Sequence, residues 1–262
     1  MPFRIRRAST PRPRSRASFA TGCFARATSA AAPADAAPPI AAVPSFQYYA
    51  ETLASWASFP GLERLDVERG GDGRVALTFD DGPDEDATPA VLDALDEAGV
   101  RATFFVVGQQ LEQHWRIARD AAERGHELAL HGYSHPRHEQ ILPQAARDEV
   151  ARGMGAFEAA VGRRPELMRP PYGRFSEHSY RACRALGLEP VYWSAWALDW
   201  EELPPERIVD LACRDLASGM IVLLHDSPRY AERRSALATA QAVAGIAERA
   251  VELGLQLGPI GA

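Results

Sequence analysis

Residues 75–83, "VALTFDDGP", place an apolar run directly before two adjacent aspartates and a Gly-Pro turn. Similar short apolar runs recur along the chain, and amphipathic helical patterns separate them. This alternation is typical of a parallel α/β sheet. About seven βα units favour a (β/α) barrel over a doubly wound sheet, and functional side chains of a barrel follow the C-terminal ends of its strands.

The boundaries of the expected elements follow from the apolar periodicity. Expected helices cover residues 90–98, about 114–124, 144–161, 177–186, 205–216 and 235–253. Expected strands cover residues 102–107, 127–130, 167–169, 190–196, 220–225 and 255–257. Residues 62–79 are predicted to form two strands around the Gly-Gly-Asp-Gly turn at 70–73.

Composition and charge exclude several classes of protein. The 262 residues are 46% apolar and 24% charged, as in a globular domain, and no apolar stretch is long enough to span a membrane. Lysine and asparagine are absent, which excludes a Schiff-base lysine, a P-loop lysine and an N-glycosylation acceptor. Seven of the 29 basic residues precede Asp35; the remaining 22 basic and 35 acidic residues give a net charge of −13, which argues against non-specific nucleic-acid binding.

The three cysteines indicate neither a disulfide framework nor a cysteine zinc site, because Cys23, Cys183 and Cys213 show no C-x-x-C spacing. Cys183 and Cys213 fall in predicted helices, where a small buried apolar role is expected.

Residues 1–45 and residues 46–262 differ in composition. Residues 1–45 consist largely of Arg, Ser, Ala and Pro and are predicted to be disordered. Their composition suits a targeting segment, but no apolar stretch of 7–15 residues follows Arg6 and Arg7, so a start assigned too far upstream is an equal alternative. Residues 46–262 are predicted to form one folded domain.

Chemically capable side chains gather at the predicted strand ends. These residues are Asp80, Asp81, His131, His135, Arg169, Tyr172, Asp199, Trp200 and His225. In a barrel all of them would converge on one face.

The pair His131 and His135 indicates a metal site. Their spacing of four residues directs both imidazoles to one point. Two imidazoles, one carboxylate and an open position for water suit a zinc-type hydrolytic site, although two surface or capping histidines are the alternative. One aspartate of the Asp80–Asp81 pair would bind the metal, and the other would act as a base kept ionised by Arg169.

Roles are also expected for the later strand ends. Asp199 would balance the buried guanidinium of Arg169, with a helix cap as the alternative. His225 would be the general acid for a leaving amine, with a satisfied core histidine as the alternative. Leu223, on the same face of that strand, would line a small apolar pocket.

Other histidines and aromatic residues are expected to be structural. His138 is predicted to lie in a solvated loop, whereas structural positions are predicted for His114, His126 and His178. Core packing is preferred to sugar stacking for most of five aromatic residues, namely Tyr48, Tyr49, Trp56, Trp193 and Trp196.

Five motifs in order resemble those of the polysaccharide deacetylases, the NodB-homology domain of carbohydrate esterase family four. The motifs are "TFDDGP" (78–83), "HGYSH" (131–135), "RPPYG" (169–173), "LDW" (198–200) and "IVLLH" (221–225). The resemblance covers residues 74 to about 257. It implies that residues 46–262 form a distorted (β/α) barrel catalytic domain.

The resemblance implies a metal-dependent hydrolase acting on carbon–nitrogen bonds other than peptide bonds. The expected reaction removes N-acetyl groups from an aminosugar polysaccharide or oligosaccharide, using Zn²⁺ or another divalent metal such as Co²⁺. The expected partner is a chitooligosaccharide- or peptidoglycan-like glycan, outside the cytoplasm, although the absence of a clear signal peptide leaves the cytoplasm open. An amidase acting on a small non-sugar substrate and a non-catalytic carbohydrate-binding module are the alternatives.

The resemblance also implies individual roles. Asp80 matches the base, and Asp81, His131 and His135 match the metal ligands. Arg169 and Asp199 match the pair that supports the base, and His225 matches the acid. The backbone N–H of Tyr172 matches an oxyanion donor. Trp200 and Leu223 match walls of the acetyl pocket.

Overall fold

A computed structural model describes residues 46–66, 68–69 and 72–261 of the chain. The predictions for residues 1–45, including disorder and the role of Cys23, lie outside these residues. No helix within the described ranges is both long and apolar enough to cross a membrane.

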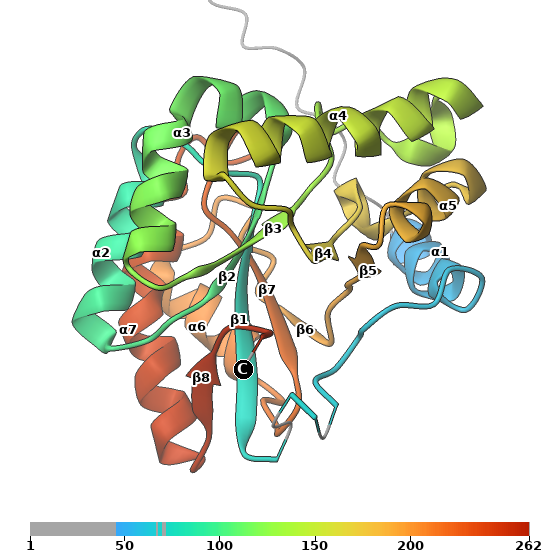
Figure 1. Ribbon diagram of the computed structural model, residues 1–262. Coiled ribbons are helices and arrows are strands. Elements are labelled where there is room, and N and C mark those ends of the chain that lie inside the picture. The colour runs from blue at the N-terminus through green and yellow to red at the C-terminus, as the bar shows by residue number, and fades with distance from the viewer. Residues whose placement is uncertain (1–45, 67, 70–71, 262) are drawn as a thin grey trace, which may run out of the picture. The chain divides into compact units, whose positions relative to one another are not determined.

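The centre of the fold is an eight-stranded parallel sheet with helices outside it (Figure 1). The strand order is β5-β4-β3-β2-β1-β7-β6, and β8 pairs with the first residues of β1. The strands are β1 (Arg74–Asp80), β2 (Thr103–Val106), β3 (Glu127–Leu130), β4 (Leu167–Met168), β5 (Glu189–Pro190), β6 (Ala195–Trp196), β7 (Ile221–His225) and β8 (Gln256–Gly258). The helices are α1 (Phe46–Trp56), α2 (Ala87–Ala98), α3 (Gly108–Glu123), α4 (Pro143–Val161), α5 (Glu177–Ala185), α6 (Pro205–Cys213) and α7 (Leu237–Glu252), with 3-10 turns at η1 (His138–Gln140) and η2 (Pro171–Gly173).

Strand β1 is buried on both faces, which explains its continuous apolar run. Val75, Leu77 and Phe79 belong to the core between the sheet and its outer helices. Ala76 belongs to the inner core, and Asp80 has the same parity and therefore faces the barrel interior. The period of two thus directs the last carboxylate of the strand inward.

The predicted alternation of strands and helices is confirmed, with shifts in boundary at several elements, α3 and the β5–β6 region among them. Helix α3 begins at Gly108 rather than near residue 114, and its regular geometry is interrupted at His114, where φ is −121°. The single strand predicted for residues 190–196 is two short strands, β5 and β6, separated by Val191 and its neighbours. Cys183 is fully buried in the inner core, as predicted, and burial raises its thiol pKa to about 12.

The hairpin predicted for residues 62–79 is wrong. Only its second half forms a strand, β1. Leu62 instead makes a parallel bridge to Val191, and Arg64 makes an antiparallel bridge to Met220. The segment therefore joins the open edge of the sheet beside β5 to the start of β7, and tertiary pairing overrides the local turn signal.

Helix α1 was not predicted from the sequence. Trp56 anchors it: its ring stacks on Tyr192 with centroids 4.4 Å apart, and its Nε1–H donates to the Gly173 carbonyl at 2.9 Å. The helix is therefore held by contacts more than 100 residues away, which local periodicity cannot reveal.

Candidate active site

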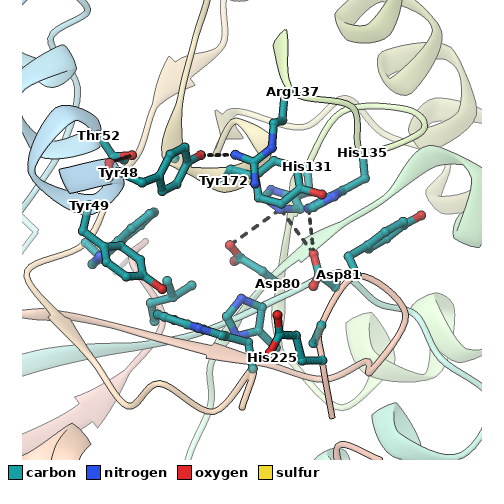
Figure 2. A pocket seen from close by; sticks show the side chains of 17 residues that line it. Tyr48, Tyr49, Thr52, Asp80, Asp81, His131, His135, Arg137, Tyr172 and His225 are labelled. Carbon is teal, nitrogen blue, oxygen red and sulfur yellow. Dashed lines mark hydrogen bonds and ion pairs between the residues drawn. The ribbon is translucent and has the colours of Figure 1, made fainter. Parts of the chain in front are cut away.

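Asp80 and Asp81 both reach one pocket because the backbone turns between them (Figure 2). Strand β1 ends at Asp80, and Asp81 has a φ of 84°, in the left-handed region that non-glycine residues rarely adopt. The next amide, Gly82 N–H, donates to Asp226 Oδ1 at 3.0 Å. A Cβ atom at Gly82 would lie 2.2 Å from Asp226 Oδ2, so this close approach requires glycine.

Asp81, His131 and His135 form a compact set of donor atoms, all within 4.8 Å of one another. Asp81 Oδ1 lies 3.1 Å from His135 Nε2 and 3.5 Å from His131 Nε2. His131 Nδ1 lies 2.8 Å from the Arg169 carbonyl, which can only accept, so Nδ1 carries the proton and Nε2 offers its lone pair.

These three residues fit a divalent metal ion. Asp81 Oδ1 is buried and has no hydrogen-bond donor among the described residues. Burial alone would raise the Asp81 pKa, but the His135 and His131 imidazoles outweigh it and hold that pKa well below its usual range. An ionised buried carboxylate beside two imidazole nitrogens is the donor set of a catalytic metal site with three protein ligands.

Arg169 holds Asp80, as predicted. Its Nη1–H donates to Asp80 Oδ1 at 2.6 Å and to Thr78 Oγ1 at 2.9 Å, while Nη2–H donates to the Tyr192 carbonyl at 2.8 Å. The contact with Asp80 uses one nitrogen rather than two. The other carboxylate oxygen, Oδ2, lies 3.7 Å from His131 Nε2, so it stays on the metal-ligand side.

The expectation that Asp199 balances Arg169 is wrong. Asp199 instead contacts His225: Oδ1 lies 2.8 Å from Nδ1, and Oδ2 accepts the backbone N–H at 2.9 Å. The reason is topological, because Asp199 follows β6, which pairs with β7, the strand that ends in His225. Leu198, directly before it, has a φ of 54° and turns the chain toward this contact.

Arg233 and Thr239 complete this group and were not predicted. Thr239 Oγ1–H donates to Asp199 Oδ2 at 2.8 Å, and Arg233 Nη1 lies 3.4 Å from the same oxygen. Arg233 Nη2–H also donates to the His225 carbonyl at 2.8 Å. Arg233 stands in the polar stretch "YAERRSA", which gives no signal that one arginine is buried.

The charges in this group are complementary. Burial lowers the pKa of His225, but the charge and hydrogen bond of Asp199 raise it, and the net shift is upward. Burial raises the pKa of Asp199, but His225 and Arg233 lower it, and the net shift is downward. His225 is therefore biased toward the imidazolium and Asp199 toward the carboxylate.

One cavity of about 200 Å³ brings the predicted residues together. Asp80, the three candidate ligands, Tyr172 and His225 line it, and so do the predicted walls Trp200 and Leu223. Three further groups line it that were not predicted as site residues: Tyr48, Tyr49 and Thr52 from α1, Arg137 and Trp193, and the segment Tyr230, Ala231 and Glu232.

Tyr172 occupies a strained position at the cavity wall. Its φ is 58°, again in the left-handed region, within the 3-10 turn η2. Its ring centroid lies 4.6 Å from that of His135, which has a φ of 63° and stacks on Tyr230 at 4.0 Å. Strained backbone of this kind concentrates at functional sites.

The prediction that His138 lies in a solvated loop is wrong, because its side chain is fully buried. The charged neighbours that suggested exposure are turned elsewhere: Arg137 lines the cavity, and Glu139 lies 3.7 Å from Arg174. Burial lowers the His138 pKa to about 3, and the residue does not join the metal-ligand set. The three histidines predicted to be structural do not line the cavity.

Sequence similarity to known proteins identifies the family of this chain. Residues 68–191 match the sequence profile described as polysaccharide deacetylase. The chain is 38% identical over 162 residues to a chitooligosaccharide deacetylase from Bradyrhizobium sp., covering 62% of this chain and 74% of that protein. It is 31% identical over 185 residues to a peptidoglycan-N-acetylglucosamine deacetylase from Bacillus cereus, covering 70% and 67%.

A solved structure agrees with this match. A family 4 carbohydrate esterase from Streptomyces lividans, in complex with acetate, has a TM-score of 0.64 at 34% identity, covering 71% of this chain and 92% of that one. This likeness in fold agrees with the distorted barrel expected from the sequence. The chain belongs to the polysaccharide deacetylase family, carbohydrate esterase family 4.

Proposed function

We propose that this protein hydrolyses N-acetyl groups on an aminosugar glycan and releases acetate, with a divalent metal held by Asp81, His131 and His135. One observation carries the proposal: a candidate base, Asp80, and a candidate acid, His225, line the same cavity as the ligand set. Each of them has an ion-pair partner: Arg169 pairs with Asp80, and Asp199 pairs with His225.

Zn²⁺ suits the donor set of two imidazoles and one carboxylate, and Co²⁺ would suit it as well. When bound, the metal supplies Lewis-acid polarisation of the carbonyl and of the attacking water. His131 is oriented for ligation by the Arg169 carbonyl, and His135 by its stacking on Tyr230.

Asp80 is proposed to remove the proton from the water. Arg169 occupies Oδ1, so the proton goes to Oδ2, the oxygen nearest the metal ligands. The water oxygen then attacks the acetamide carbonyl carbon. Arg169 keeps the carboxylate in position for this transfer; burial lowers the Arg169 pKa, and the charge of Asp80 opposes that shift.

The acetamide C–N bond breaks only when the leaving nitrogen receives a proton. His225 is proposed to donate it from Nε2, since Nδ1 is engaged with Asp199. The backbone N–H of Tyr172 is proposed to donate to the oxyanion formed at the former carbonyl. The products are acetate and the free amine of the sugar.

The cavity walls suit an acetylated sugar. Leu223 and Trp200 flank His225 and offer an apolar surface to the acetyl methyl; the Trp200 ring lies 5.5 Å from the His225 ring, edge to face. Tyr49 Oη, Trp193 Nε1 and Trp200 Nε1 are buried polar atoms without a hydrogen-bond partner in the described residues. A sugar ring can stack on such aromatic side chains while its hydroxyls satisfy their polar atoms.

The direct test measures acetate release from chitooligosaccharides, peptidoglycan and small acetamides. Each substrate is assayed before and after chelation, and again after addition of Zn²⁺ or Co²⁺. We expect glycan-dependent acetate release that chelation abolishes and metal restores. His131→Ala should lose bound metal and activity together, whereas His178→Ala, at a half-buried histidine that does not line the cavity, should keep both.

Three outcomes would contradict the proposal. Full activity after exhaustive chelation would remove the metal from the reaction. Turnover of small acetamides alone would indicate an amidase, and glycan binding without acetate release would indicate a binding module.

A further inference from the structure

Arg137 is a fixed cation at the cavity wall. It lies two residues after His135, and its guanidinium lies 3.9 Å from the Tyr172 ring centroid and 4.7 Å from that of Tyr48. Its Nη1–H also donates a hydrogen bond to the Tyr48 hydroxyl. Figure 2 shows Arg137 across the pocket from His225. The guanidinium is therefore held between two aromatic rings at the side of the cavity opposite the candidate acid.

No acidic side chain forms an ion pair with Arg137 in the described ranges, and Asp81, which lines the same cavity, faces His131 and His135 instead. The nearby acids Glu51 and Glu139 pair with Arg174, at 3.8 and 3.7 Å. Within the cavity, Asp80 is held by Arg169 at 2.6 Å. Aromatic rings attract a guanidinium but do not neutralise it, so its remaining N–H donors can serve an anion in the cavity.

The two edges of the cavity differ in charge. Glu232 lines the edge beside Trp200, since its backbone N–H donates to the Trp200 carbonyl at 3.2 Å. Arg137 lines the edge beside Tyr172. An anionic group on a substrate would be attracted to the Arg137 edge and repelled from the Glu232 edge, which orients the sugar.

Part of this arrangement lies outside the region that defines the family. Tyr48 belongs to α1, and α1 ends at Trp56, before residue 68, where the family match begins. The helix is nevertheless fixed to the barrel through Trp56 and the Gly173 carbonyl. The cradle for Arg137 is thus built by joining an additional helix to the family core.

We infer that Arg137 is a specificity-determining residue that binds a carboxylate carried by the glycan, so that the protein prefers an acidic aminosugar glycan to a neutral one. This inference rests on the proposed deacetylation. A carboxylate matches the planar donor fork of arginine, and the aromatic cradle reduces the conformational freedom that binding would otherwise remove. The carboxylate belongs to a lactyl ether or to a uronic acid on the sugar ring.

The experiment compares kcat/KM for acetate release from four soluble substrates of matched length. These are a neutral chitooligosaccharide, a peptide-free fragment containing N-acetylmuramic acid, the same fragment with its carboxylates methyl-esterified, and an N-acetylated oligosaccharide containing uronic acid. We expect at least one acidic substrate to exceed the neutral one by about tenfold or more, as charge-assisted hydrogen bonds allow. If the muramic acid fragment is that substrate, esterification should remove its advantage. The two acidic substrates distinguish the lactyl from the uronic source.

Two variants test the residue itself. Arg137→Met should reduce the ratio of acidic to neutral kcat/KM to near one, mainly through KM, and Arg137→Lys should retain part of the preference. Arg152→Met is the matched control, because Arg152 also stacks on a tyrosine, Tyr133, at 3.8 Å but does not line the cavity. Misfolding, or displacement of His135, would lower kcat/KM for the acidic and the neutral substrate alike and leave their ratio unchanged.

The outcomes separate this inference from the proposed function. A wild-type ratio of one or less, or an unchanged ratio in an Arg137→Met variant that keeps its rate on the neutral substrate, would overturn the role of Arg137 while deacetylation still stood. Absence of acetate release from every substrate would overturn the proposed function, and the inference with it.

Discussion

His225 and Asp199 contact each other twice: Nδ1 of the histidine lies 2.8 Å from Oδ1 of the aspartate, and the histidine backbone N–H donates to Oδ2 at 2.9 Å. A carboxylate that binds both the ring and the backbone of one histidine fixes the ring orientation as well as its tautomer. Nε2 is left as the nitrogen available for proton transfer to a substrate.

The first prediction concerns the pH dependence of His225. Burial lowers its pKa and Asp199 raises it, with a net upward shift from 6.5. An acid must be protonated to act, so kcat/KM should fall as pH rises through the His225 pKa. His225→Ala should keep bound metal, lose about 10²–10⁴-fold in rate and show a flattened alkaline limb. An alkaline limb identical to that of the wild type would remove His225 from the mechanism.

The second prediction separates the adjacent aspartates. Asp80→Asn should retain metal, because Asp80 lies outside the ligand set, yet lose activity by orders of magnitude, because an amide cannot accept the proton. Asp81→Asn should lower metal affinity as well. Metal content by mass spectrometry and acetate release on the same samples make the comparison. Equal loss of metal in both variants would mean that Asp80 is also a ligand.

The third prediction assigns Arg233 as a positioning residue. Removing its positive charge beside Asp199 favours the imidazolium of His225, so Arg233→Met should shift the alkaline limb to higher pH while kcat falls. Arg234→Met is the matched control: its side chain is exposed, and only its backbone N–H bonds to Glu202. A lower kcat with an unmoved alkaline limb would indicate a structural role only.

The fourth prediction concerns stability. Burial raises the pKa of Asp226 from 3.8 to about 7, although the hydrogen bond from Thr88 opposes the shift. The folded state therefore holds this proton more tightly, so the stabilisation is present below the unfolded pKa and is lost as pH rises to about 7. Asp226→Asn cannot ionise and should lack this pH-dependent loss.

Denaturant unfolding of the metal-free protein at several pH values between about 4 and 7 checks this prediction. The free energy of unfolding of the wild type should decline relative to that of Asp226→Asn as pH rises. Asp215→Asn, at a side chain that is 85% exposed, is the control and should follow the wild type. Parallel curves for Asp226→Asn and the wild type would contradict the assignment.

The sequence allowed the barrel and the grouping of Asp80, Asp81, His131, His135 and His225 to be predicted for one physical reason. Parallel strands end at the same edge, so residues directly after apolar runs must meet there. In the structure, the period of two along β1 directs Asp80 into the barrel interior. These inferences need only local pattern and topology.

The parts of the fold and of the candidate site that were not predicted depend on tertiary contacts, first of all on which strands are neighbours. Asp199 was expected to pair with Arg169, but β6 lies beside β7, and this places Asp199 next to His225. Arg233 and Arg234 are adjacent in a polar loop, and only tertiary packing determines that Arg233 is the buried one. Helix α1 is held by contacts of Trp56 with Tyr192 and Gly173, which are more than 100 residues away. A local sequence pattern carries no signal for such contacts.

The support for His225 reaches far along the chain. Thr239, in α7, donates to Asp199 from 40 residues away, and Arg233 lies just before that helix. A chain in which α7 has not docked would leave His225, the proposed acid, without the Thr239 hydrogen bond to its partner Asp199. Under the proposed function, acetate release would therefore report that the C-terminal helix has docked on the barrel.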